Sequence, residues 1–134
     1  MTKHLLTSLI FVCIFIEACN DNDSGPDQRA ALIGEWNYVS KEYFGCTDAA
    51  DNRLLECGAN NTYAFCLDMN LKSDGTYFFE TNAVTPAGKW AIAGSELMIY
   101  GTFGYSLTQS TLILETTVTD AASGCKERYT YTKK

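Results

Sequence analysis

The chain has 134 residues, enough for one domain, and a formal net charge of −6 at pH 7. This acidic balance argues against nucleic-acid binding, which needs a basic surface to neutralise phosphates. The composition, 46% hydrophobic and 19% charged, also excludes a disordered acidic chain. The single histidine, His4, lies in a segment that we expect to be removed, so the mature protein would lack the commonest catalytic base near neutral pH.

Residues 1–18 have the pattern of a secretory signal peptide. A short polar segment precedes an apolar run over residues 5–16, which is shorter than the roughly 20 residues that a membrane-spanning helix needs. The run ends in Ile-Glu-Ala-Cys at residues 16–19, which resembles the lipobox of bacterial lipoproteins. The resemblance implies cleavage before Cys19 and attachment of lipid to its thiol, which would anchor the protein in a membrane.

Residues 19–30 are predicted to form a flexible acidic tether. Between Asn20 and Gln28 the chain has no apolar residue and is rich in turn-forming residues. An acidic stretch directly behind a lipidated cysteine resembles the signal that sends some lipoproteins of the Bacteroidota to the outer face of the outer membrane. We therefore expect a lipid-anchored outer-membrane protein, which either faces the periplasm or is displayed on the cell surface.

Residues 31–134 are predicted to form an all-β domain, with at most one short helical turn at 28–32. Alternating apolar residues and turn signals, including Asp74-Gly75, define eight short strands with hairpin-length connections. The strands are expected at residues 33–42, 63–72, 76–81, 88–93, 96–100, 105–108, 111–118 and 125–132. Eight antiparallel strands in sequence order predict an up-and-down barrel, which removes exposed sheet edges, with a two-sheet sandwich as the alternative.

Four cysteines besides Cys19 remain in the predicted domain, namely Cys46, Cys57, Cys66 and Cys125. In a protein exported beyond the inner membrane they indicate two disulfides, and their spacing does not decide among three pairings. We favour Cys46 with Cys57, which flank one polar loop, and Cys66 with Cys125, which would join an early strand to the last. Zinc binding is disfavoured because no C-x-x-C spacing occurs.

Short motifs in the predicted strands resemble a known family. Gly34-Glu35-Trp36 is similar to the G-x-W motif of lipocalins, and residues 71–77, 88–92 and 111–114 are similar to segments of bacterial lipocalin-like domain lipoproteins of the Bacteroidota type. The resemblance covers about residues 31–132 and implies a lipocalin-like barrel. In lipocalins an arginine of the last strand lies across the tryptophan of the motif, and Arg128 is the residue expected to match it.

The aromatic residues are the most informative side chains. The residues expected to face inward are Trp36, Tyr38, Phe65, Phe79, Trp90, Tyr105 and Tyr131, with Leu67, Met69 and Ile92. All of them except Trp36 and Ile92 are expected to bind a ligand. They predict either a lumen for a small hydrophobic ligand, oriented by tyrosine hydroxyls, or a core that the side chains fill. No nucleophile–base pair, G-x-S-x-G motif or phosphate loop is present in the sequence, so we expect a monomeric non-enzyme without cofactor or metal.

Two other functions stay open at this point. The loop 44–62 carries Asp48, Asp51 and Glu56, which would suit a basic target if the protein inhibits lysozyme or a protease. Exposed aromatic residues near that loop, Tyr43 and Phe44, would instead suit an accessory protein of glycan uptake. The expected partners are therefore the membrane through lipidated Cys19, a small hydrophobic ligand or another protein, and not nucleic acid.

Overall fold

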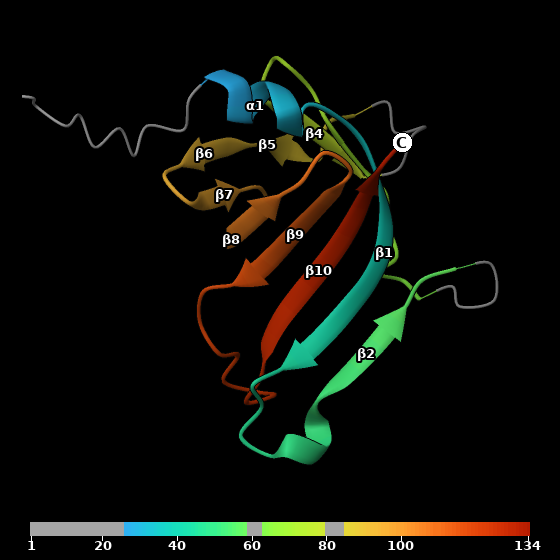
Figure 1. The fold of residues 1–134 in the computed structure, drawn as a ribbon, viewed down its shortest axis with the longest axis vertical. Helices are drawn as coiled ribbons and strands as arrows, with labels where there is room; N and C mark the ends of the chain where they lie inside the picture. Colours follow the sequence, from blue (N-terminus) through green and yellow to red (C-terminus); the bar gives the residue numbers. More distant parts are fainter. Residues whose placement is uncertain (1–25, 59–62, 80–84) are drawn as a thin grey trace, which may run out of the picture.

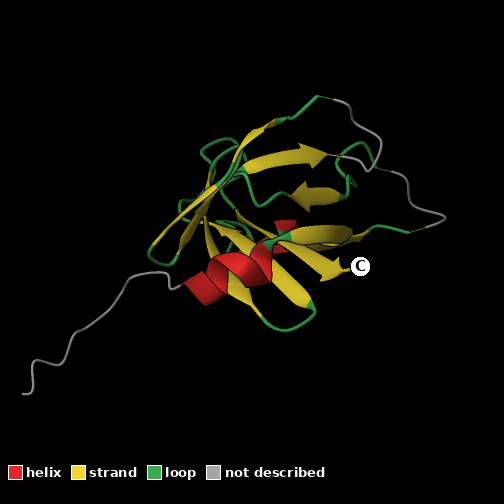
Figure 2. Cartoon of the chain, turned by 90° about the horizontal axis from the view of Figure 1, so that it is seen from above, coloured by secondary structure: helices red, strands yellow, loops and turns green. Residues whose placement is uncertain are grey.

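The computed structural model describes residues 26–58, 63–79 and 85–134. A curved antiparallel sheet forms a nearly closed barrel, and one short helix lies at one end of it (Figures 1 and 2). From the other end, the long strands β1 and β10 extend with β2 into a narrower projection. We call this projection the arm and define it as residues 44–56 together with 117–126.

The described elements follow one another as a helix and ten strands. Helix α1 spans Pro26–Leu32, and a 3₁₀ helix spans Ala49–Asp51. The strands are β1 (Gly34–Phe44), β2 (Arg53–Glu56), β3 (Met69–Leu71), β4 (Thr76–Phe79), β5 (Gly88–Lys89), β6 (Ala91–Ala93), β7 (Glu96–Met98), β8 (Thr102–Leu107), β9 (Thr111–Thr116) and β10 (Lys126–Lys133). Residues 26–30, predicted as part of the tether, are thus helical.

Nine strands form the barrel sheet, in the order β5-β4-β3-β1-β10-β9-β8-β7-β6, and β2 pairs with β1 outside this path. Only Trp90 separates β5 from β6, so the two ends of the sheet are joined by continuous chain. The predicted all-β antiparallel barrel is confirmed, but the eight-strand count is not. The expected strand 88–93 is divided at Trp90, the expected strand 63–72 is shortened to β3, and β2 lies within the predicted loop 44–62.

Trp90 stabilises the junction between β5 and β6, where the two ends of the sheet meet. We call this junction the seam of the barrel. The tight turn predicted at Asp74-Gly75 is present, and Gly75 has a φ of 84°, a conformation that glycine adopts without strain. The backbone N–H of Trp90 donates to the carbonyl of Gly75 at 2.7 Å, and its Nε1 donates to the carbonyl of Lys72 at 2.9 Å. The Arg29 guanidinium of α1 lies 4.3 Å from the Trp90 ring centroid, so the helix packs onto the seam.

The core begins beneath α1 and is filled by apolar side chains at that end. Leu32, Trp36, Leu71 and Leu112 are completely buried. The Trp36 Nε1 donates to the carbonyl of Leu32 at 2.8 Å, which satisfies the indole N–H inside the core. The first strand therefore anchors the helix, and near α1 the filled-core alternative describes the interior.

Lys133 is the cation that lies over the Trp36 ring, so the prediction that Arg128 lies there was wrong. Trp36 and Lys133 are partners in the β1–β10 ladder, and the Lys133 Nζ lies 5.3 Å from the Trp36 ring centroid. Arg128 is instead the partner of Glu42, and its guanidinium lies 4.5 Å from the Phe44 ring centroid. The register of β10 therefore places Arg128 beside the arm, far along β1 from Trp36.

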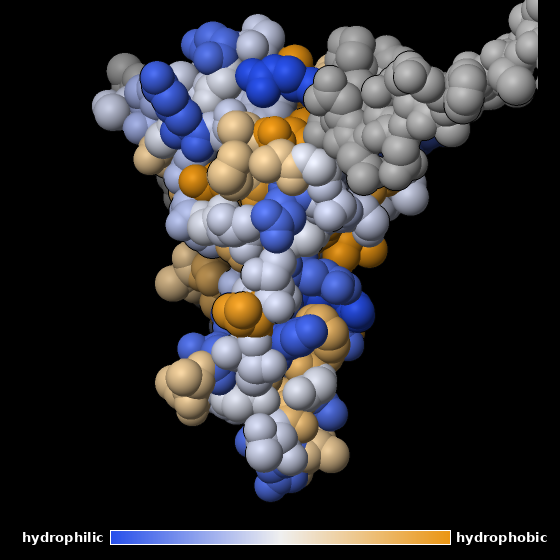
Figure 3. All heavy atoms as spheres, turned by 90° about the vertical axis from the view of Figure 1, so that its left-hand side faces the viewer, coloured by the Kyte–Doolittle hydropathy of each residue, from blue (hydrophilic) through white to orange (hydrophobic). Residues whose placement is uncertain are grey.

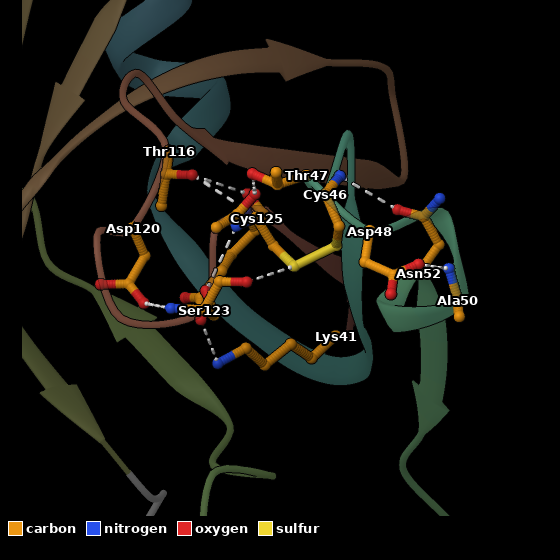
Figure 4. The surroundings of a disulfide bond; sticks show 12 residues. Lys41, Cys46, Thr47, Asp48, Ala50, Asn52, Thr116, Asp120, Ser123 and Cys125 are labelled. Atoms are coloured by element: carbon orange, nitrogen blue, oxygen red, sulfur yellow. Dashed lines mark hydrogen bonds and ion pairs between the residues drawn. A yellow bond between two sulfur atoms is a disulfide. The ribbon is translucent and has the colours of Figure 1, made fainter.

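The two disulfides are Cys46–Cys125 and Cys57–Cys66, so the favoured pairing was wrong. Cys46 and Cys125 lie just beyond the paired ends of β1 and β10, with Cα atoms 3.9 Å apart (Figure 4). Beside them, the N–H of Thr47 donates to the carbonyl of Gly124 at 2.9 Å. Because β2 runs back along β1, it carries Cys57 away from Cys46 and towards Cys66.

Loss of the Cys46–Cys125 disulfide is expected to destabilise the fold more than loss of Cys57–Cys66. The cysteines are 79 residues apart in the first bridge and 9 in the second. In the chain-entropy account, Cys46→Ser/Cys125→Ser loses about 4.5 kcal/mol and Cys57→Ser/Cys66→Ser about 2.5 kcal/mol. Urea unfolding followed by tryptophan fluorescence measures both losses. Equal losses, or the opposite order, would contradict the explanation by loop length.

Candidate functional site

The aromatic side chains gather at the end of the barrel opposite α1. The rings of Phe79, Tyr100 and Phe103 follow one another at centroid distances of 5.5 and 5.0 Å, and Phe103 lies 5.7 Å from Tyr129. Tyr129 in turn contacts Tyr38, whose ring also contacts Tyr131 and Phe65. We call this set the aromatic cluster, and its members are Tyr38, Phe65, Phe79, Tyr100, Phe103, Tyr129 and Tyr131.

The aromatic cluster bridges the two ends of the sheet. Phe79 ends β4 and Tyr100 follows β7, and these strands lie near opposite ends of the strand order. Their contact therefore crosses the seam on the side away from α1. Tyr129 and Tyr131 share one face of β10 because side chains alternate along a strand. Tyr38 is the ladder partner of Tyr131, with ring centroids 4.8 Å apart in an edge-to-face contact.

A β-bulge in β1 adds a charged pair to this face. The β1–β10 register shifts between Tyr38 and Ser40, so Lys41 becomes the partner of Tyr129. Opposite residues in a ladder point to the same side of the sheet, so the shift turns Lys41 towards the side of Tyr129 and Glu127. The Lys41 Nζ lies 2.8 Å from the Glu127 carboxylate, and the Tyr129 hydroxyl donates to the same carboxylate.

Lys41 is held in its charged form by this arrangement. Burial by itself would lower the pKa of the ammonium group, but hydrogen bonds and charge from Glu127 and Tyr43 outweigh it and raise the pKa. The Lys41 Nζ also lies 4.6 Å from the Tyr43 ring centroid and 5.3 Å from that of Tyr129. The charges of Lys41 and Glu127 thus neutralise each other at the edge of the aromatic cluster.

The Tyr38 hydroxyl is buried and has no hydrogen-bond partner within the described residues. The Tyr38 side chain is 8% exposed, and burial, with smaller effects from Tyr100 and Glu127, raises its pKa far above the ordinary value. The hydroxyl therefore stays protonated and is a donor at neutral pH. An unsatisfied buried donor costs about 1–3 kcal/mol, so this hydroxyl is the most unusual polar group of the cluster.

The other tyrosines of the cluster are also protonated at neutral pH. Burial raises the pKa of Tyr131 and of Tyr129, and hydrogen bonding to Glu127 adds to the shift of Tyr129. Burial, followed by the charge of Glu127, raises the pKa of Tyr100 to about 12, although 48% of this residue is exposed.

Four of the eight predicted ligand-binding residues, Tyr38, Phe65, Phe79 and Tyr131, belong to the aromatic cluster. A fifth, Met69, is buried beside it as the ladder partner of Phe79. The other three lie elsewhere: Trp90 holds the seam, Tyr105 donates to Gln28 of α1 at 2.9 Å, and Leu67 is half-buried ahead of β3. Sequence reasoning missed Tyr100, Phe103, Tyr129, Lys41 and Glu127, although the two-residue spacing from Tyr131 was a signal for Tyr129.

The arm carries the acidic residues of the predicted loop 44–62. Asp48, Asp51 and Glu56 are all exposed, and the Asp48 carboxylate accepts from the N–H of Ala50 at 2.9 Å, which caps the 3₁₀ helix. Asp120 lies on the facing loop, where hydrogen bonds from Ser123 lower the pKa of its carboxyl (Figure 4). In Figure 3 the molecule narrows at the arm, and polar and apolar residues are mixed along the visible face.

Comparisons with protein-family models, with curated proteins and with solved structures find no match. Over residues 26–58, 63–79 and 85–134, no group of three or more His, Cys, Asp or Glu residues is placed to hold a metal ion. In the same part of the chain, no helix has the length and apolar character to cross a membrane. The resemblance to lipocalin-like lipoproteins therefore stays a prediction from the short motifs.

The raised pKa values of the tyrosines predict that the fold weakens at high pH. In the unfolded chain tyrosines ionise near pH 10, whereas the buried Tyr131 hydroxyl stays protonated in the folded protein. The contribution of each such group is complete below about pH 10 and is lost as the pH rises further. Above pH 10, each such tyrosine should lower the unfolding free energy by about 1.4 kcal/mol per pH unit. Tyr131→Phe should remove this contribution, so its unfolding free energy should fall less steeply with pH.

Urea unfolding at a series of pH values from neutral to strongly alkaline measures this slope. Tyr63→Phe is the matched control, because Tyr63 is 41% exposed, and it should leave the slope unchanged. A slope that is the same in Tyr131→Phe and in the unmodified protein would contradict the burial of the Tyr131 hydroxyl.

Proposed function

We propose that the protein binds a small hydrophobic molecule at the aromatic cluster of its lipocalin-like barrel. The observation that carries this proposal is a gradient of exposure along contacting rings. Tyr63, 41% exposed, stacks on Phe65 at 5.0 Å, Phe65 contacts Tyr38, and Tyr38 contacts Tyr131, which is 1% exposed. The contacting rings therefore form a continuous apolar row from the surface to the core, which supports a site for a molecule that leaves water.

The charges around this row of rings agree with an apolar ligand. Lys41 and Glu127 neutralise each other at 2.8 Å, and the tyrosine hydroxyls of the cluster stay uncharged at neutral pH. Aromatic rings supply large contact areas and orient a bound molecule, while hydroxyls fix its polar atoms. With no reactive arrangement in the sequence, binding without catalysis is the function that these residues support best.

The proposal includes lipid attachment at Cys19 and a place at the outer membrane. Cys19, the signal peptide 1–18 and the tether up to residue 25 lie outside the described residues. Their support is the lipobox resemblance at residues 16–19 and the acidic stretch behind it. A lipid-anchored binding protein of this kind would work as a monomer, with its barrel held near the membrane by its N-terminal segment.

Ligand binding is tested by two neighbouring phenylalanines on opposite faces of β4. Phe79 belongs to the aromatic cluster, whereas Phe78 points to the other side of the sheet because side chains alternate along a strand. Phe79→Leu should weaken binding of the neutral fluorescent probe N-phenyl-1-naphthylamine about tenfold, since a ring contact contributes about 1.4 kcal/mol. Phe78→Leu, the matched control, should leave the affinity unchanged.

Fluorescence titration of the probe measures both affinities. Absence of saturable binding to the unmodified protein at micromolar concentrations, or equal affinities of the two variants, would contradict the proposed site.

A second function, inhibition of a basic enzyme such as lysozyme or a protease, is favoured by the arm. The arm projects from the barrel, the Cys46–Cys125 disulfide fixes its end, and its exposed residues include Asp48, Asp51 and Glu56 (Figure 1). Opposite charges accelerate the encounter of two proteins. The glycan-uptake alternative gains no such support, because cations lie over the Tyr43 and Phe44 rings.

Replacement of the three acidic residues distinguishes the arm from the barrel. If the arm inhibits a basic enzyme, Asp48→Ala/Asp51→Ala/Glu56→Ala should reduce inhibition at least tenfold, because three opposite charges are lost at the contact. A lysozyme activity assay with increasing inhibitor measures this, and probe binding by the barrel should be unchanged. Lack of inhibition by the unmodified protein, or equal inhibition by the variant, would contradict this role for lysozyme.

A further inference from the structure

We infer that the bound molecule carries an uncharged oxygen that accepts a hydrogen bond from the Tyr38 hydroxyl. This inference rests on the proposed binding function and names the chemistry of its ligand. The hydroxyl is buried, the side chain is 8% exposed, and the described chain supplies no acceptor for it. Buried hydroxyls in folded proteins nearly always have a partner, so an acceptor beyond the described residues, which we assign to the ligand, completes this one.

The surroundings of Tyr38 require that the rest of the molecule be apolar. Its ring lies 4.8 Å from the Tyr131 ring, 6.1 Å from the Phe65 ring and 6.4 Å from the Tyr129 ring. A molecule that reaches the hydroxyl from the surface passes these rings. An extended polar molecule would lose its hydration there without compensation, whereas an apolar skeleton would be favoured.

The charges near Tyr38 select against an anionic oxygen. The carboxylates of Glu127 and Asp68 are its acidic neighbours: Glu127 helps to raise the pKa of Tyr38, and Asp68 accepts from the Tyr38 backbone N–H at 2.9 Å. Each is already paired with a lysine, Glu127 with Lys41 at 2.8 Å and Asp68 with Lys134 at 3.1 Å. A ligand carboxylate at the Tyr38 hydroxyl would thus meet the negative charge of Glu127, whose cationic partner Lys41 is already engaged.

An ammonium group is disfavoured for a different reason. The Tyr38 hydroxyl is a donor, and a protonated amine has no lone pair with which to accept its hydrogen. The face of the cluster that would attract a cation is occupied by Lys41, which lies near the Tyr43, Phe65 and Tyr129 rings. The remaining class is an apolar molecule with a ketone, ester, ether or alcohol oxygen.

Three probes of nearly equal size test this assignment. They are 2-acetylnaphthalene, which has a ketone oxygen, 2-ethylnaphthalene, which has none, and 2-naphthoate, which has a carboxylate. The unmodified protein should bind the ketone about fivefold more tightly than the hydrocarbon, the effect of one net hydrogen bond, and should bind the carboxylate most weakly. Quenching of tryptophan fluorescence, checked by calorimetry, measures the three affinities.

Tyr38→Phe removes the hydroxyl and keeps the ring packed against Tyr131, so the fold is expected to persist. This variant should bind the ketone and the hydrocarbon equally. Tyr105→Phe is the matched control, because it removes a hydroxyl at the α1 end of the same barrel. It should keep the fivefold preference for the ketone.

The outcomes separate the two proposals. Equal binding of ketone and hydrocarbon by the unmodified protein would overturn the role of Tyr38, as would a ketone preference that survives in Tyr38→Phe or tighter binding of the carboxylate. In each of these cases the barrel still binds an apolar molecule, and the proposed function stands. Failure of all three probes to bind would overturn the proposed function together with this inference.

Discussion

The long ladder between β1 and β10 is the interaction on which the rest of the structure depends. It runs from the pair Trp36–Lys133 to the pair Phe44–Lys126 and extends beyond the barrel to the arm (Figure 1). At one end it carries the tryptophan that holds α1 through the carbonyl of Leu32. In its middle lie Tyr38 and Tyr131, and beyond its other end the Cys46–Cys125 disulfide prevents the strands from separating. One strand pair thus connects the core, the candidate site and the arm.

The bulge at Val39 decides what kind of site this ladder can make. With an unbroken register, Tyr129 would lie opposite Ser40, and Lys41 would point to the other side of the sheet. The extra residue instead brings Lys41 to Glu127 and Tyr129, so the carboxylate has a cationic partner within the apolar environment. An unpaired carboxylate at this place would be costly to bury and would make the interior less suited to an apolar molecule.

Local patterns and the order of neighbouring strands predicted from the sequence agree with the structure, whereas the residue pairs predicted between distant segments do not. The turn at Asp74-Gly75 and the inward direction of Tyr38 and Tyr131 follow from glycine conformation and from alternation along a strand. The disulfide partners were missed because β2 was not recognised inside a polar loop. Arg128 was placed over Trp36 because the register of the last strand is set by the whole ladder and leaves no local signal. The bulge, and with it Lys41, was invisible for the same reason.

The position of α1 distinguishes the two ends of the barrel. The helix lies at one pole of the barrel, and the arm extends from the other (Figure 1). The tyrosines of the aromatic cluster lie further from the helix along β1 and β10 than Trp36 and Lys133, which donate to the carbonyls of Leu32 and Ala31. A protein fastened to a bilayer through the chain ahead of α1 would turn its opposite pole outward. Exchange of a small molecule and encounter with a macromolecule would then both take place on the side facing away from the lipid, without hindrance from the anchoring surface.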